Sequence, residues 1–101
     1  MKQLDLPEHE LAVLRETFGR FPTIQRVCIF GSRANGSARR ASDIDLAIFA
    51  TNATPAEWSE ISEALEEASV IFHMDIIRGD AAVSPRLRQK IETEGVRIYP
   101  E

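Results

Sequence analysis

The alternation of apolar and polar positions along the chain predicts helices and strands in regular succession. A capping-box pattern with a proline in the first turn precedes the first set of apolar residues at helical spacing, and such a pattern is typical of a helix start. The predicted helix runs from about Pro7 to Gly19, with Asp5 and Glu8 in the capping pattern and Leu11, Leu14 and Phe18 on one face. The same reasoning predicts a helix behind Thr54-Pro55-Ala56-Glu57 and a last one that opens at Ser84-Pro85 and ends near Gly95.

Short runs rich in β-branched and aromatic residues separate these helices and predict strands. The predicted strands span Arg26 to Phe30, Asp43 to Phe49, Val70 to Ile77 and Val96 to Tyr99, and a loop or short helix is expected between Gly31 and Ser42. Helices and strands therefore alternate in an α/β or α+β unit. The length of 101 residues accommodates a single domain, which we expect to span residues 1–101.

The number and distribution of charged residues indicate which classes of partner are disfavoured. The chain carries 12 Lys and Arg against 16 Asp and Glu, and its basic residues are scattered rather than gathered in one stripe. This distribution argues against a long nucleic acid as the main partner. No apolar stretch approaches the roughly 20 residues of a membrane span, so a cytoplasmic protein is expected. The one cysteine, Cys28, lies in an apolar run and is predicted to be a buried thiol.

Two aspartates, Asp43 and Asp45, stand two positions apart at the start of the second predicted strand. Side chains alternate between the faces of a strand, so both carboxylates should project from one side while Ile44, Leu46 and Ile48 face the other. Neighbouring carboxylates repel each other unless a cation lies between them, and Mg²⁺ prefers carboxylate, water and phosphate oxygens. The alternative is that both aspartates are solvated at the end of a strand.

A third carboxylate, Asp75, lies inside the apolar run of the next predicted strand, where burial of a lone charge is expensive. Asp45 and Asp75 are 30 positions apart, and the interval includes a predicted helix. This length suits a crossover connection between neighbouring strands, so we expect the three carboxylates to meet at one place. His73 should share a strand face with Asp75 and could contact the site, but we expect a structural or supporting role for it.

The dipeptide Gly31-Ser32 follows the first predicted strand directly. Free backbone N–H groups at such a position can bind phosphate together with the serine hydroxyl, and a glycine lets the backbone come close. An ordinary turn is the alternative for this dipeptide by itself. Arg33, Arg39 and Arg40 follow it, and a solvated loop is their expected setting. The alternative is that they contact the triphosphate or carboxylates of a partner.

In combination, these residues resemble a known signature. Gly31-Ser32, ten further residues, Asp43-x-Asp45 and a strand-borne Asp75 are similar to the pattern of the polymerase-β-like nucleotidyltransferase superfamily. At this length the chain resembles the minimal nucleotidyltransferase (MNT) family, whose members are commonly paired with HEPN-domain partners as antitoxin and toxin. The resemblance covers roughly Val27 to Ile77 and implies the polymerase-β-like nucleotidyltransferase fold, with a small mixed β-sheet flanked by helices.

The resemblance also implies a site and a reaction. Gly31 and Ser32 would bind the triphosphate of ATP, and Asp43 and Asp45 would hold Mg²⁺. Asp75 would complete a second metal site or take the proton from the acceptor hydroxyl. Two ions are therefore expected, and AMP would pass from ATP to a hydroxyl as pyrophosphate leaves. For an MNT protein the implied acceptor is a tyrosine of a HEPN toxin, which makes the chain an antitoxin that acts as a protein adenylylyltransferase.

Two other functions stay open from the sequence. A non-catalytic antitoxin or scaffold would neutralise its partner by binding alone, although such a protein has no need of three converging carboxylates. Transfer to a small molecule such as an aminoglycoside would require an extra binding module or a dimer cleft. Because a chain of this length has little room for a deep cleft, we expect a homo-oligomer or hetero-oligomer to complete the acceptor site.

Overall fold

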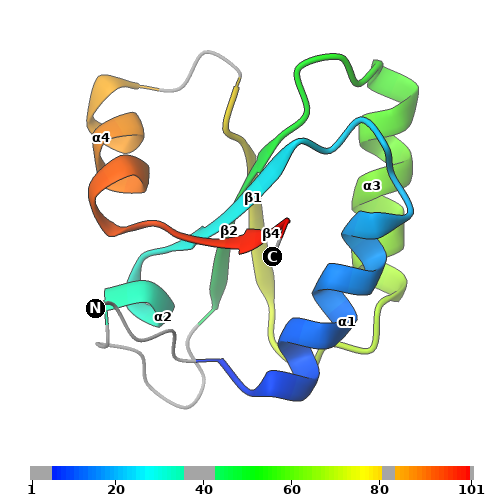
Figure 1. Ribbon diagram of the computed structural model, residues 1–101, viewed down its shortest axis with the longest axis horizontal. Helices are drawn as coiled ribbons and strands as arrows, with labels where there is room; N and C mark the ends of the chain where they lie inside the picture. The colour runs from blue at the N-terminus through cyan, green and yellow to red at the C-terminus, as the bar shows by residue number, and fades with distance from the viewer. Residues whose placement is uncertain (1–5, 36–42, 81–83, 101) are drawn as a thin grey trace.

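The computed structural model describes residues 6–35, 43–80 and 84–100, to which the structural statements below apply (Figure 1). The elements follow in the order α1 (Glu8–Gly19), β1 (Arg26–Phe30), α2 (Ser32–Asn35), β2 (Ile44–Phe49), α3 (Pro55–Glu67), β3 (Met74–Arg78), α4 (Pro85–Glu94) and β4 (Val96–Tyr99). The strands form one sheet in the order β3-β2-β1-β4. β2 is parallel to β3, whereas β1 is antiparallel to both β2 and β4, so the sheet is mixed, as the resemblance implied. None of the described helices has the length and apolar character that a membrane crossing needs.

The helices cover the two faces of the sheet unequally. α1 and α3 lie side by side over one face, where they enclose the larger core (Figure 1). This core includes Leu14, Phe18, Ile29, Ile44, Leu46, Ile48, Ile61 and Leu65. On the other face, α4 packs over a smaller cluster made of Phe30, Ala47 and Ile91. The alternation predicted for the second strand is confirmed, because Ile44, Leu46 and Ile48 share the first face.

One of the two predicted capping boxes, at the start of α3, is confirmed. Before α3, the Glu57 N–H donates to Thr54 Oγ1 at 3.1 Å and the Thr54 N–H donates to Glu57 Oε1 at 3.3 Å. The capping box predicted for α1 is wrong: the residue before the helix is Pro7, which makes no side-chain cap, and Asp5 lies outside the described residues. A proline has no side-chain oxygen to accept a hydrogen bond from the first turn, so α1 begins without a side-chain cap.

β3 begins later than its apolar run predicted. The expected strand started at Val70, but β3 starts at Met74, opposite Ile44, which is the first residue of β2. Hydrogen bonds to a neighbouring strand define where a strand begins, and here the Ile44 N–H donates to the His73 carbonyl oxygen at 2.9 Å. Upstream of this bond the apolar run is not a buried strand, and Ile71 within it is 81% exposed.

Cys28 is a free, buried thiol in β1, as predicted. Burial raises the pKa of this thiol above its ordinary value, and the nearby charges of Arg26 and Arg97 oppose that rise. A protonated thiol is a weak nucleophile, because the thiolate is the reactive form. Cys28 therefore serves as a small apolar residue of the sheet.

Candidate active site

The aspartates gather where β2 and β3 begin. The parallel register places Asp45 directly opposite Asp75, and Asp43 lies one residue before β2. This arrangement follows from the crossover through α3, which brings two strands that are distant in sequence side by side. Asp45 alternates with the buried residues Ile44 and Leu46, so its side chain lies on the sheet face opposite to the larger core.

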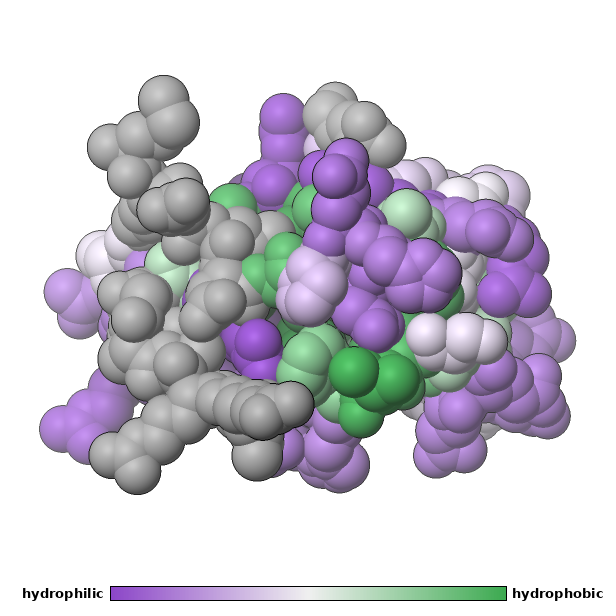
Figure 2. All heavy atoms as spheres, turned by 90° about the horizontal axis from the view of Figure 1, so that it is seen from below, coloured by the Kyte–Doolittle hydropathy of each residue, from purple (hydrophilic) through white to green (hydrophobic). Residues whose placement is uncertain are grey.

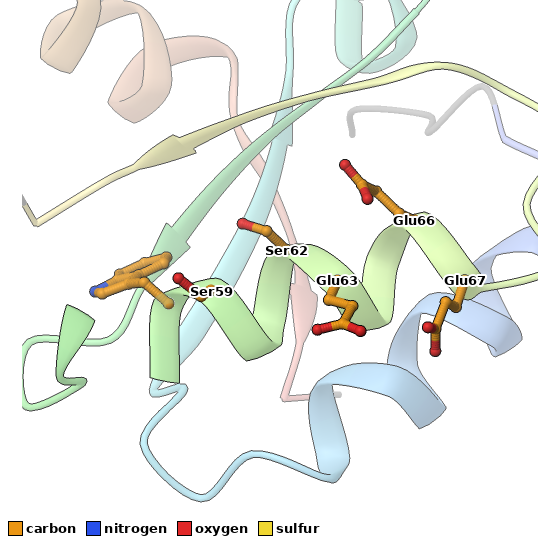
Figure 3. A pocket seen from close by; sticks show the side chains of 6 residues that line it. Ser59, Ser62, Glu63, Glu66 and Glu67 are labelled. Atoms are coloured by element: carbon orange, nitrogen blue, oxygen red, sulfur yellow. The ribbon is translucent and has the colours of Figure 1, made fainter. Parts of the chain in front are cut away.

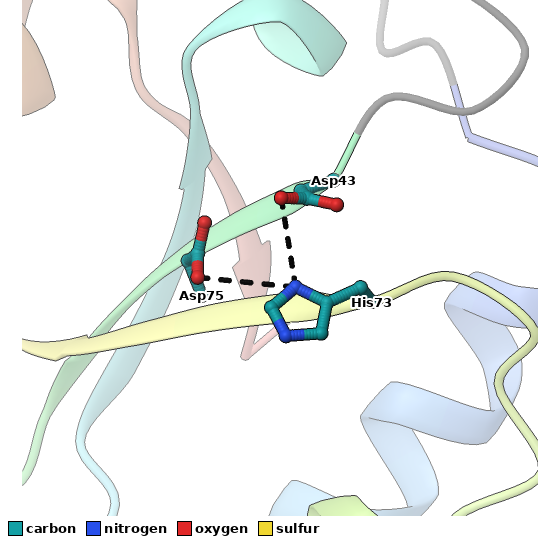
Figure 4. Close-up of side chains that lie close together, drawn as sticks. All are labelled: Asp43, His73 and Asp75. Atoms are coloured by element: carbon teal, nitrogen blue, oxygen red, sulfur yellow. Dashed lines mark ion pairs between the residues drawn. The ribbon is translucent and has the colours of Figure 1, made fainter.

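Asp43, His73 and Asp75 point toward one another in Figure 4. His73 Nδ1 lies 3.5 Å from Asp43 Oδ2 and 3.9 Å from Asp75 Oδ1. One ligand atom from each of the three residues lies within 4.8 Å of the others, a spacing at which they could share a metal ion. The three side chains are between 49% and 71% exposed, so this cluster is open to a substrate from solvent.

His73 belongs to this cluster more directly than its predicted supporting role suggested. It precedes β3 and lies between the carboxylates of Asp43 and Asp75. The signal in the sequence was the spacing His73-x-Asp75, which repeats the spacing of Asp43-x-Asp45 on the neighbouring strand. On parallel strands in register, equal spacings place side chains in pairs on one face.

Asp45 is less exposed than Asp43 and Asp75, and its electrostatic setting differs from theirs. Partial burial is the largest cause that raises the pKa of the Asp45 carboxyl above its ordinary value, and the negative charge of Asp75 raises it further. Lys90 lowers this pKa, and Asp43 adds a smaller rise. A cation placed among these carboxylates would relieve their repulsion, so the electrostatics of the site favour metal binding.

Lys90 is a site neighbour that the sequence analysis did not single out. It lies on α4, and its charge acts on Asp45 from the helix that packs over this face of the sheet. The available signal was helical spacing, since Lys90 is three positions after Leu87 and one before Ile91. Leu87 and Ile91 both pack against the sheet, which brings the lysine between them to the same side.

Gly31 directly follows β1 and has a conformation that favours glycine, with a φ of 77°. A Cβ atom at this position would collide with the carboxylate of Asp45. The glycine therefore allows the turn between β1 and α2 to pass directly against Asp45. Ser32 is the first residue of α2, but its side chain lies outside what the structure describes, so its contact with phosphate stays a prediction.

The solvated setting expected for Arg33 is wrong. Arg33 is only 4% exposed, and its Cζ atom lies 4.2 Å from the centre of the Phe72 ring. The next residue, Ala34, belongs to the larger core. α2 therefore closes one end of that core, and the guanidinium is held against an aromatic face. Arg39 and Arg40 lie outside the described residues.

The chemistry of these groups suits a phosphate-bearing substrate and a divalent cation. The carboxylates of Asp43, Asp45 and Asp75 are the oxygen ligands that a hard cation prefers. Their negative charge would repel a polyphosphate unless metal ions offset it. A backbone turn at Gly31 next to these carboxylates can bring N–H groups close to such a substrate. This combination is typical of metal-assisted transfer of a phosphorus-centred group.

Known proteins similar in sequence point to the same chemistry. The family model described as Polymerase beta, Nucleotidyltransferase matches residues 13–101. A probable protein adenylyltransferase MntA of Haemophilus influenzae is 31% identical over 78 residues, and the alignment covers 74% of this chain and 67% of that protein.

Solved structures share the fold. A crystal structure of a toxin-antitoxin with AMP-PNP contains a chain that matches with a TM-score of 0.68 and 25% identity, over 93% of this chain and 73% of the other. A complex of a tri-AMPylated Shewanella oneidensis HEPN toxin with an MNT antitoxin contains a chain that matches with a TM-score of 0.59 and 19% identity, over 91% and 71% of the two chains. At 19% identity the likeness concerns the fold alone.

Proposed function

The chain belongs to the polymerase-β nucleotidyltransferase family, and we propose that it transfers AMP from ATP to a hydroxyl group of a protein partner with the help of Mg²⁺. The observation that carries this proposal is the register of β2 and β3, which sets Asp45 opposite Asp75. Asp43 and His73 lie beside them. A module that only binds a partner has no use for carboxylates that repel one another at the start of neighbouring strands.

The proposed partner is a HEPN-domain toxin, with a tyrosine hydroxyl as acceptor. The relative from Haemophilus influenzae is a probable protein adenylyltransferase, and the AMP-PNP complex comes from a toxin-antitoxin. A phenolic hydroxyl, with a pKa of about 10, gives up its proton more easily than an aliphatic hydroxyl. Attachment of AMP to the toxin would inactivate it, so the chain would act as an antitoxin.

The proposed reaction is an in-line displacement at the α-phosphorus of ATP. The acceptor oxygen forms a bond to this phosphorus, the bond from phosphorus to the α,β-bridging oxygen breaks, and pyrophosphate leaves. Asp75 either takes the proton of the hydroxyl or serves a second metal ion. Gly31 and Ser32 bind the triphosphate, and Lys90 adds a positive charge on the same face of the sheet.

The donor set fits Mg²⁺. Asp43 and Asp45 would hold the first ion, and Asp75 would help to hold a second. When bound, the metal offsets negative charge on the triphosphate and on the leaving pyrophosphate. The imidazole of His73 is a poorer ligand for so hard a cation, and its 71% exposed side chain has room to turn away from the carboxylates.

Intact-mass spectrometry of the HEPN partner tests this proposal. The partner is incubated with ATP, Mg²⁺ and either the wild-type chain or the Asp43→Asn/Asp45→Asn variant, whose circular dichroism should match that of the wild type. The expected result is a mass gain of one adenylate or a small multiple with the wild type and none with the variant. A partner that stays unmodified yet binds tightly to both proteins would contradict transfer and favour an antitoxin that acts by binding alone.

A further inference from the structure

We propose that the groove between α3 and β3 is the docking site for the partner segment that carries the acceptor hydroxyl, and that this segment has apolar anchors flanked by Lys or Arg. The inference rests on the proposed function, because it concerns how the acceptor reaches that site. The groove has a volume of about 440 Å³. Its walls are residues of α3, of the segment that follows α3, and of β3 itself.

The groove combines apolar and polar lining residues and lies at an edge of the sheet. β3 is the terminal strand in the order β3-β2-β1-β4, so β2 is its one strand neighbour among the described residues. Val70, Phe72, Met74 and Ile76 line the groove and are only partly buried. Ile71, between two of them, is 81% exposed and is the one exposed large hydrophobic residue in the described part of the chain. Apolar surface at an open sheet edge is typical of a protein contact.

Figure 2, which views the molecule from below, shows hydrophobic residues with hydrophilic residues next to them. Apolar surface with polar groups at its border is the usual composition of an interface. Buried apolar anchors supply most of the affinity in such contacts, while the polar rim aligns the partner.

The groove opens onto the candidate active site through His73. This residue lines the groove, and its Nδ1 atom lies 3.5 Å from Asp43 Oδ2 and 3.9 Å from Asp75 Oδ1. A segment that lies along β3 with its anchors between Val70 and Ile76 therefore has one end beside the carboxylates. Because the Asp45 side chain lies on the sheet face opposite to α3, the segment would turn around the edge of the sheet at β3 to bring its hydroxyl to the site.

The charge of α3 indicates a basic partner. The helix carries five glutamates and no lysine or arginine. Glu66 lines the groove, and Glu63 and Glu67 line a neighbouring hollow on the outside of the helix. In Figure 3, Ser62 and Glu66 point toward β3, whereas Glu63 and Glu67 point toward α1. Lysine or arginine next to the apolar anchors would complement this surface.

The same charges disfavour two other occupants. A second copy of this chain, with a net charge of −4, would bring like charges together along α3. A nucleic acid would place its phosphates against Glu66 and its neighbours on the helix, where they are repelled. A basic protein segment is the occupant that both the apolar lining and the acidic rim favour.

Calorimetric titration of the full chain with the purified, unmodified HEPN partner, without ATP, tests the docking site. Glu66→Lys, in the lining of the groove, and Ile71→Asp, at an exposed apolar residue beside it, should each weaken the affinity by about tenfold or more. Glu92→Lys is the matched control, because it makes the same charge change at an exposed residue of α4, away from the groove. We expect it to change the affinity by less than about twofold. In AMP transfer, the Glu66→Lys and Ile71→Asp variants should raise the KM for the partner and keep kcat at saturating partner.

Binding and transfer are judged separately. Equal affinities for the wild type, Glu66→Lys and Ile71→Asp, or no binding by the wild type, would overturn the docking site. Transfer of AMP by the same proteins decides the proposed function. Groove-dependent binding without transfer by the wild type would support the docking site and contradict the proposed function. A wild-type dimer in sedimentation that Ile71→Asp converts to a monomer would make a second copy the occupant and overturn the proposal. Ile71 is mostly exposed, so the variant should keep the wild-type thermal midpoint.

Discussion

The two faces of the sheet are built from the same strands but differ in what covers them. On the face under α1 and α3, Ile44, Leu46 and Ile48 of β2 are fully buried. On the opposite face, α4 covers Ala47, and Asp45 lies toward the end where Asp43 and Asp75 are exposed. Along β2, residues of the larger core therefore alternate one by one with residues of the other face, and among these Asp45 belongs to the candidate site.

This difference separates the sources of stability and activity. The face under α1 and α3 supplies most of the apolar burial, which is the main favourable contribution to folding. The face under α4 carries the carboxylates at its uncovered end, and their mutual repulsion opposes folding but favours cation binding. Substitutions at adjacent positions of one strand should therefore affect different properties, and the predictions below test that separation.

The largest effect on stability is expected on the face under α1 and α3. Leu46→Ala should lower the free energy of unfolding by about 2 to 5 kcal/mol, because it leaves a cavity at a fully buried position. Ile77→Ala, at a partly buried position on the α4 face, should cost about 1 to 2 kcal/mol. Urea unfolding measures both values. A loss for Ile77→Ala that equals or exceeds that for Leu46→Ala would contradict the comparison of the two faces.

A smaller effect is expected at the turn that connects β1 to the candidate site. Gly31→Ala should cost about 1 to 3 kcal/mol of stability, since it strains a residue with a φ of 77° and pushes a Cβ atom into Asp45. AMP transfer should fall as well, because the Asp45 carboxylate must move. Gly19→Ala is the control: a Cβ there meets nothing within 4 Å, and the helix should gain about 0.5 to 1 kcal/mol. Thermal unfolding in which both variants behave alike would rule out strain at Gly31.

The smallest effect concerns the charge of Asp45. The folded-state pKa of this carboxyl is raised, so the folded protein binds more protons than the unfolded chain between the ordinary and the raised value. The stability of the wild type should fall as pH rises through that window, and it should stay lower above the window. Asp45→Asn has no carboxyl at this position and does not lose stability in this way. Its free energy of unfolding should therefore slightly exceed that of the wild type at neutral pH but not at low pH.

Urea unfolding in EDTA across this pH range checks the prediction. Added Mg²⁺ should then stabilise the wild type more than Asp45→Asn, because only the wild type keeps the full charge of the site. A stability difference in favour of Asp45→Asn that shrinks as the pH rises would contradict a raised pKa of the Asp45 carboxyl, whose causes are partial burial and the charge of Asp75.

The elements could be predicted from the sequence where local patterns determine them. The capping box of α3 uses residues three positions apart, and the alternation in β2 follows from strand geometry alone. The capping box of α1 and the start of β3 were predicted wrongly for different reasons. Pro7 replaces a side-chain cap in α1, whereas the start of β3 depends on its pairing with β2.

The part of the candidate site that depends on the connection between β2 and β3 could be predicted from the sequence. The crossover between β2 and β3 was enough to infer that Asp45 and Asp75 lie side by side. The burial of Arg33 against Phe72 and the approach of Lys90 toward Asp45 depend on how α2 and α4 pack, which no local pattern specifies. The roles of these residues in transfer remain predictions for experiment.

The measurement that tests the central claim most directly is the rate of AMP transfer by Asp45→Asn and by Asp80→Asn. Both variants remove one carboxylate, but Asp80 is an exposed residue just after β3, at the end of the strand away from Asp75. We predict that Asp45→Asn loses at least about a hundredfold in kcat/KM, because it removes charge that positions metal and triphosphate. Asp80→Asn should keep the wild-type rate. Equal rates for the two variants would contradict the assignment of nucleotidyl transfer to the start of β2 and β3.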